Sequence, residues 1–118
     1  MGNSLEMARI ACKALDDKKG LDLKVIDIRG VSVIADYFVI ASATNQNQIQ
    51  AMVDNVEEQL GRAGFEPKQV EGNRSSSWIL MDYEDIIVNV FDEENRLFYD
   101  LDRIWRDGKS VDVEEFLK

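Results

Sequence analysis

The sequence of 118 residues contains no histidine, one cysteine and one proline. Without histidine, the chain lacks the side chain that most often serves as a general base near neutral pH and as a metal ligand. The single Cys12 excludes a disulfide within the chain, and no histidine is present to activate its thiol as a nucleophile. These absences exclude the commonest hydrolytic and zinc-binding arrangements, and we expect a protein that is not an enzyme.

Long apolar runs are also missing. The longest unbroken run is residues 37–41 (YFVIA), far below the roughly 18 residues that span a bilayer. The first residues show no basic region followed by an apolar stretch, so no secretory signal is expected. No P-loop, dinucleotide fingerprint or zinc-binding set of residues occurs. We therefore expect a cytoplasmic protein that has neither a membrane partner nor a cofactor.

Charge is abundant and mostly negative. The 23 acidic residues against 14 basic ones give a net charge of −9. Binding to a phosphate backbone needs clustered Lys and Arg, so little direct contact with nucleic acid is expected. A negative surface suits docking onto a basic protein, because complementary charge steers the encounter. The same charge also simply keeps a protein soluble, and composition by itself favours that simpler interpretation.

Hydrophobic periodicity predicts helices and strands in alternation. Helices are predicted over residues 4–18 and 45–63, where apolar residues recur at helical spacing. Ser4 can cap the first helix, Thr44 or Asn45 can cap the second, and glycines follow both. Predicted strands cover residues 21–28, 37–43, 67–71, 78–81 and 86–91. A third helix is expected over residues 95–106, with a short helical turn in 112–118.

The order of these elements predicts the fold class. We expect one domain over residues 1–118, since the length suits one domain and neither an internal repeat nor a linker occurs. The expected fold is α/β, of the α+β type, with a single mixed β-sheet of about five strands and flanking helices. Residues 82–85 join the last two strands as a hairpin. The alternation of the first strand breaks at Val25 and Ile26, which predicts a bulge or burial on both faces.

Two acidic residues in the last predicted helix could carry chemistry. Asp100 and Asp102 have the spacing of a nucleotidyltransferase acidic pair, which would hold magnesium for phosphoryl transfer. That chemistry needs both acids on one face of a strand. The surrounding pattern is helical, which turns the two side chains about 200° apart. This geometry argues against catalysis, so a divergent magnesium-dependent nucleotidyltransferase is kept only as the alternative hypothesis.

The hairpin is the other candidate site. Trp78 and Tyr83 stand beside acidic residues, a combination typical of partner hot spots, where truncation often costs about 2 kcal/mol or more. Trp78 fits a core aromatic equally well, and the pattern alone does not decide between the two. Trp105, on the apolar stripe of the last predicted helix, is expected in the core. Cys12 is expected to be a small buried hydrophobe rather than a reactive thiol.

Three blocks resemble the Iojap-like ribosomal silencing factor family. Residues 36–42 (DYFVIAS) resemble its D-Y-F-V-I-x-(S/T) signature. Residues 71–88 contain E-G, W-I-L-M-D-Y and D-I-I-V in the order of its second block, E-G-x(n)-W-(I/V)-x-x-D-(Y/L)-G-D-(V/I)-(V/I)-V. Residues 96–105 (RLFYDLDRIW) are similar to its closing segment, R-x-Y-x-L-E-x-L-W. Order and spacing agree from about residue 5 to residue 107, nearly the whole chain.

The sequence departs from the family pattern in three places. Asn89 stands where the family usually has histidine, Glu84 replaces the usual glycine of the hairpin, and residues 43–45 (ATN) replace Gly-Thr-Ser. None of these changes alters the expected fold. They leave open any role that needs the histidine, and the turn geometry at Glu84.

The resemblance implies a fold related to nucleotidyltransferases but without their catalytic groups. It also implies binding to the large ribosomal subunit at ribosomal protein fourteen, a basic protein at the subunit interface. Occupying that site blocks association with the small subunit and represses translation. This block is steric, so no enzyme activity and no cofactor are implied. Some family members also self-associate, which leaves a homodimer open.

The expected partner-binding surface lies on the hairpin and on the segment after it. The expected contact residues are Trp78, Leu80, Asp82, Tyr83, Asp85, Arg96 and Tyr99. Alternation along the strand places Trp78, Leu80 and Asp82 on one face of the sheet, and Ile79 and Met81 on the other face, in the core. Trp78 would be an apolar anchor, and the two aspartates would pair with Lys or Arg of the partner.

Overall fold

The computed structural model describes residues 4–30, 35–72, 78–92, 109–111 and 113–117. Its elements are α1 (Ser4–Asp17), β1 (Leu21–Asp27), β2 (Tyr37–Ala43), α2 (Gln46–Arg62), β3 (Gln69–Glu71), β4 (Trp78–Asp82), β5 (Ile86–Asp92), β6 (Lys109–Val111) and α5 (Val113–Leu117). The predicted helices over 4–18 and 45–63 and all five predicted strands are confirmed. The predicted helix over 95–106 lies outside the described residues. No helix in the described ranges is long and apolar enough to cross a membrane.

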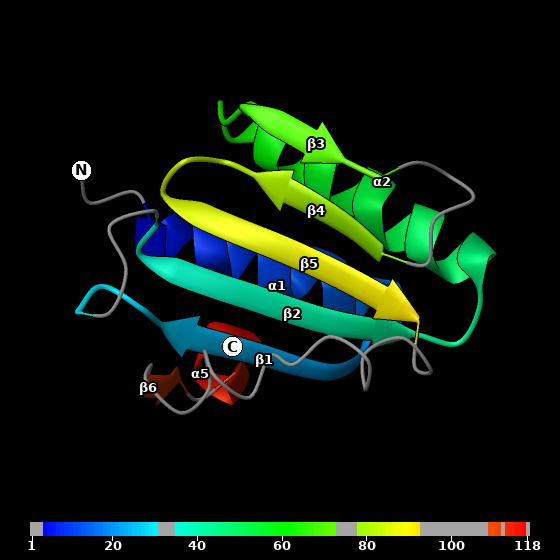
Figure 1. The fold of residues 1–118 in the computed structure, drawn as a ribbon, viewed down its shortest axis with the longest axis horizontal. Coiled ribbons are helices and arrows are strands. Elements are labelled where there is room, and N and C mark those ends of the chain that lie inside the picture. The colour runs from blue at the N-terminus through cyan, green and yellow to red at the C-terminus, as the bar shows by residue number, and fades with distance from the viewer. Residues whose placement is uncertain (1–3, 31–34, 73–77, 93–108, 112, 118) are drawn as a thin grey trace.

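The strands form one mixed sheet in the order β3-β4-β5-β2-β1-β6 (Figure 1). β2 and β5 run parallel at its centre, and the other neighbouring pairs are antiparallel. The predicted α+β class with a single mixed sheet of about five strands is confirmed, and the described residues form six strands, including the five that were predicted. The additional strand, β6, pairs with the end of β1 at the edge of the sheet. Its three residues are too few to show an alternation in the sequence.

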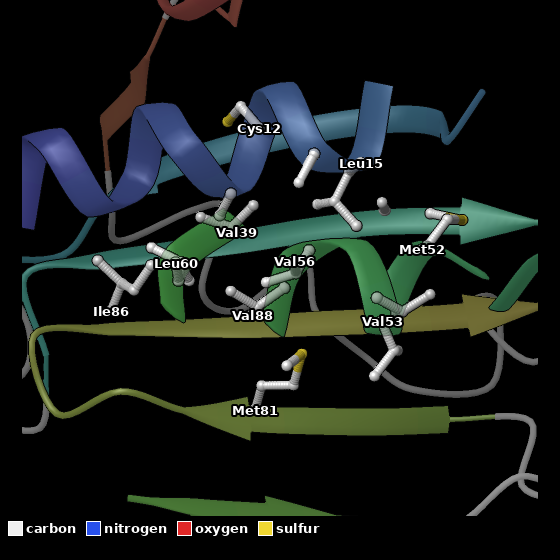
Figure 2. Packing of buried hydrophobic residues seen from close by; sticks show 14 of the residues in the cluster. Cys12, Leu15, Val39, Met52, Val53, Val56, Leu60, Met81, Ile86 and Val88 are labelled. Carbon is white, nitrogen blue, oxygen red and sulfur yellow. The ribbon is translucent and has the colours of Figure 1, made fainter. Parts of the chain in front are cut away.

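Helices α1 and α2 lie side by side over one face of the sheet (Figure 1). Their apolar stripes interlock with every second residue of the central strands, and α5 packs against α1 and β1. Figure 2 shows this helix-side core, which includes Cys12, Leu15, Val39, Met52, Val53, Val56, Leu60, Met81, Ile86 and Val88. Fully burying one such aliphatic side chain stabilises the fold by about 1.5–3 kcal/mol, so this layer supplies most of the driving force.

Cys12 confirms the expectation of a buried hydrophobe. Its side chain has no exposed surface and lies in the helix-side core (Figure 2). Burial first, and the negative charge of Asp16 second, raise the pKa of the thiol to about 12. The thiol is therefore protonated near neutral pH, which makes it a poor nucleophile.

The polar first turn of α2 is a structural cap. Asn45 is the N-cap, and its side-chain oxygen accepts a hydrogen bond of 2.8 Å from the backbone N–H of Gln48. The Gln48 side chain donates in turn to the carbonyls of Lys18 and Lys19 at the end of α1, over 3.1 and 2.9 Å. These bonds satisfy helix-end groups and tie the two helices together. Beyond the other end of α2, Gly64 takes a φ of 93°, the left-handed conformation that favours glycine.

A second apolar cluster lies on the opposite face of the sheet. Val25 belongs to the helix-side core and Ile26 to the second cluster, so the predicted two-sided burial of β1 is confirmed. The register irregularity of β1 falls earlier, between Leu21 and Lys24. The buried members of this second cluster are Ile26, Ile28, Ala35, Phe38, Ile40, Ile87 and Phe91, with Trp78 and Leu80 packed against them at the β4 side. Helices α1 and α2 lie behind the sheet in Figure 1, away from this face.

Candidate partner-binding face

The register of the β4–β5 hairpin sets the candidate face. Trp78 pairs with Phe91, Leu80 with Asn89 and Asp82 with Ile87. Burial along β4 alternates between half-buried and buried residues, and Ile79 and Met81 lie in the helix-side core. The prediction that Trp78, Leu80 and Asp82 share one face while Ile79 and Met81 face the core is therefore confirmed. Trp78, Leu80 and Asp82, together with the exposed turn residues Glu84 and Asp85, are called the hairpin face below.

Trp78 is half-buried and held from two directions. Its ring stacks on Phe91 with centroids 5.6 Å apart and the planes 9° from parallel. Its indole N–H donates to the side-chain oxygen Oδ1 of Asn89 over 3.0 Å. The indole is therefore neither enclosed in the core nor loose on the surface. A fixed aromatic that keeps part of its surface open loses little conformational freedom when a partner covers it.

The turn of the hairpin is held by its own hydrogen bonds. The backbone N–H of Glu84 donates to Oδ1 of Asp82, and that of Asp85 donates to the carbonyl of Tyr83, each over 2.8 Å. The backbone N–H of Asp36 reaches the carbonyl of Asp85, also over 2.8 Å. Asp82 is half-buried and uses one carboxylate oxygen inside the turn, whereas Glu84 and Asp85 are exposed. The turn thus presents negative charge on an ordered backbone.

Glu84 adopts a backbone conformation that suits glycine. Its φ is 68°, in the left-handed region, and the bond between Asp85 and Tyr83 closes a γ-turn around it. A side chain with a Cβ is strained there, by roughly 1–3 kcal/mol in such sparsely populated regions. Within the described residues, the Glu84 side chain makes an exposed ion pair with Lys68, with 3.7 Å between Oε1 and Nζ, and such pairs contribute little.

We predict that Glu84→Gly stabilises the chain by about 0.5–1 kcal/mol, because relief of the strain exceeds the entropy that glycine adds to the unfolded state. Urea denaturation followed by circular dichroism measures the change. Glu84→Val is the matched variant, because it also removes the charge but adds branching at Cβ, and it should destabilise. Equal effects of the two substitutions would show that the backbone at residue 84 is not strained.

The structure corrects the prediction that Tyr83 is a partner contact. Its side chain is only 4% exposed and belongs to the helix-side core. Burial raises the pKa of its hydroxyl most, and the negative charges of Glu57 and Glu66 raise it further. The alternation that turns Ile79 and Met81 inward continues to residue 83, and the prediction failed because it treated Tyr83 as part of an exposed turn. Tyr83 is therefore not on the hairpin face.

The other predicted residues divide into two groups. Arg96 and Tyr99 lie outside the described residues, as do Asp100, Asp102 and Trp105. Leu80 is half-buried beside Trp78, and Asp85 is exposed on the turn. Among the residues that the structure describes, no group of three or more acidic or cysteine side chains is placed to hold a metal ion.

Two residues that support the Trp78 side chain were not predicted from the sequence. Asn89 and Phe91 hold the Trp78 ring, yet neither was a predicted site residue. Both stand on β5, at register positions within reach of residue 78 across the hairpin. Once a hairpin is predicted, cross-strand pairing is the signal that could have found them, because opposed and diagonal residues on one face interact.

Comparisons with known proteins identify a family whose members are similar to this chain. A family model described as "Ribosomal silencing factor during starvation" matches residues 2–118. "Ribosomal silencing factor RsfS" of Bacillus subtilis (strain 168) is 33% identical over 112 residues, which cover 95% of each chain. "Protein Iojap, chloroplastic" of Zea mays is 25% identical over 92% of this chain and 47% of its own length. A crystal structure of a protein from Chromobacterium violaceum, 29% identical, superposes with a TM-score of 0.82 over 86% of this chain and 84% of that one.

Proposed function

This chain belongs to the ribosomal silencing factor family, which gives it a ribosome-associated silencing role, and we propose that it binds the large ribosomal subunit. The proposed site is ribosomal protein fourteen, where the bound chain blocks association with the small subunit and represses translation. We further propose that residues 1–118 act as one domain in the cytoplasm, without enzyme activity, a cofactor or direct contact with nucleic acid.

The hairpin face is the observation that carries this proposal. It combines a fixed, half-buried Trp78 with the exposed carboxylates of Glu84 and Asp85. Central aromatic anchors supply most of the energy of protein interfaces, and charge complementarity governs which partner approaches. A chain with a net charge of −9 is suited to a cationic protein neighbour rather than to exposed ribosomal RNA.

Steric exclusion suffices for the proposed effect. The folded chain measures 33 × 32 × 27 Å, so a bound copy fills a volume that the joining surface of another subunit would need. Competition for one site raises the small-subunit concentration required for joining by a factor of 1 + [L]/Kd, where L is this chain. At 100 times Kd this factor is about 100. No reacting group is required of the protein.

Sucrose-gradient sedimentation with purified subunits tests the proposal. The chain should sediment with large subunits and not with small ones. When it is added before mixing, the fraction of joined ribosomes should fall as the chain concentration rises. The proposed function would be contradicted if the chain sedimented with neither subunit, or if a saturating concentration of the chain left the fraction of joined ribosomes unchanged.

Asp85→Asn should slow association with the large subunit about threefold at low salt and leave dissociation nearly unchanged. Asp85 is exposed, and rim charges act mainly on the encounter, which salt screens. Stopped-flow or surface-plasmon kinetics at two ionic strengths measures both rates. Asp17→Asn, which removes an exposed charge at the end of α1, is the control. A slower rate that persists at high salt, or an equal loss in the control, would contradict the assignment.

A further inference from the structure

Asn89 is a polar residue in an otherwise apolar stretch of β5. Its neighbours along the strand, from Ile86 to Phe91, are apolar and buried, and Asn89 itself is only 1% exposed. Its Nδ2 group has no hydrogen-bond partner within the part of the chain that the structure describes. An unpaired donor in a buried position lowers stability. Leucine has a similar size and would fill the same place without that cost, so the asparagine needs an explanation other than packing.

The side-chain oxygen of Asn89 explains why an asparagine stands at this position. Oδ1 of Asn89 accepts the indole N–H of Trp78 over 3.0 Å, while Phe91 stacks on the same ring. Stacking fixes the plane of the indole but leaves it free to slide or to turn within that plane. The hydrogen bond fixes the direction of the N–H edge. Together the two contacts define one orientation of a ring that is only half-buried.

We propose that Asn89 is a positioning residue for partner binding, which holds the Trp78 indole in the orientation that the large subunit recognises. This inference rests on the proposed function. Asn89 touches no partner atom in this scheme and acts only through Trp78. Without the acceptor, the indole N–H turns toward water, and the ring must be reordered when the partner arrives, which weakens binding.

A purely structural role for Asn89 would give a different pattern. In that case Asn89→Leu would lower the melting temperature and weaken binding together, whatever residue stands at position 78. In the positioning role, Asn89→Leu removes a buried Nδ2 donor that has no acceptor among the described residues, and the half-buried indole N–H turns to water. The melting temperature therefore stays equal or rises while binding weakens. Stability and affinity therefore move apart, as is common where a functional group is kept at the expense of the fold.

A double-mutant cycle with Trp78→Phe tests the inference. Phenylalanine keeps a ring that can stack on Phe91 but has no N–H for Asn89 to accept. Asn89→Leu should weaken binding to purified large subunits about tenfold in the wild-type background, because the released indole must be ordered again when the partner binds. In the Trp78→Phe background it should change the affinity less than about twofold, because the two side chains act as one unit. Melting temperatures of all four proteins are measured by circular dichroism.

The outcomes separate the two proposals. Three results would overturn the positioning role while the wild-type chain still binds large subunits. These are an unchanged affinity of Asn89→Leu, an equal loss of affinity in the Trp78 and Trp78→Phe backgrounds, and a clearly lower melting temperature that accompanies the loss. Failure of the wild-type chain to bind large subunits would overturn the proposed function, and the role of Asn89 would fall with it. A tenfold loss confined to the tryptophan background, without loss of stability, supports both.

Discussion

Replacing Trp78 by alanine should weaken binding to the large ribosomal subunit by about 30-fold or more and leave the chain folded. The expected size follows from hot-spot aromatics, whose truncation costs about 2 kcal/mol or more, and from a tenfold change for each 1.4 kcal/mol or so. The indole is half-buried and packs against the second cluster rather than filling the helix-side core. Its loss therefore removes apolar contact area from the hairpin face more than it opens a cavity in the fold.

The matched control for this substitution is Leu5→Ala. Leu5 is the most exposed large apolar residue on α1, with 42% of its surface open, and α1 covers the face of the sheet opposite Trp78. Affinities are compared by sedimentation or surface-plasmon titration with large subunits, with circular dichroism confirming that both variants are folded. Equal affinities of Trp78→Ala and Leu5→Ala would remove Trp78 from the interface.

Leu15→Ala should destabilise the chain by about 2–5 kcal/mol, the range for a buried leucine that leaves a cavity. Leu15 has no exposed surface and lies where α1 meets β2 and α2 (Figure 2). Alanine is a good helix former, so the loss reflects packing rather than helix propensity. A small domain has only about 5–15 kcal/mol of stability in total, so this substitution should bring the chain close to unfolding.

Leu5→Ala is again the matched control, because it deletes the same atoms from the same helix at an exposed position. Its effect should stay within about 0.5 kcal/mol. Urea denaturation measures the difference: if the dependence of the unfolding free energy on urea concentration is the same in both variants, the shift in midpoint gives the change in stability. If Leu15→Ala were as stable as Leu5→Ala, the helix-side core would not be organised around α1 as described.

Much of the fold was predictable because burial imposes strong periodicities on this sequence. The predicted bounds of β2, residues 37–43, match the observed strand, and α1 ends one residue earlier than predicted. β2 is buried along its whole length and α1 buries one apolar stripe, and such patterns are visible in the sequence without knowledge of the neighbouring elements. β6 was missed because three residues carry no periodicity, and only pairing with the distant β1 makes them a strand.

The site was predictable in part for the same reason. Alternation placed Trp78, Leu80 and Asp82 together, because each strand residue takes the face opposite its neighbour. Tyr83 was misplaced since the alternation continues into the turn. The support from Asn89 depends on the register between β4 and β5, which the turn sets and which one strand alone does not reveal.

Site-specific photo-cross-linking tests the hairpin face most directly. A photoreactive side chain at position 85, in the exposed turn, and one at position 5, on α1, are compared in chains bound to purified large subunits. Mass spectrometry then identifies the ribosomal component attached to each. We expect position 85 to join a basic protein of the large subunit, ribosomal protein fourteen, and position 5 to give no ribosomal product. Cross-links from position 5 with none from position 85, in complexes that form normally, would contradict docking through the hairpin.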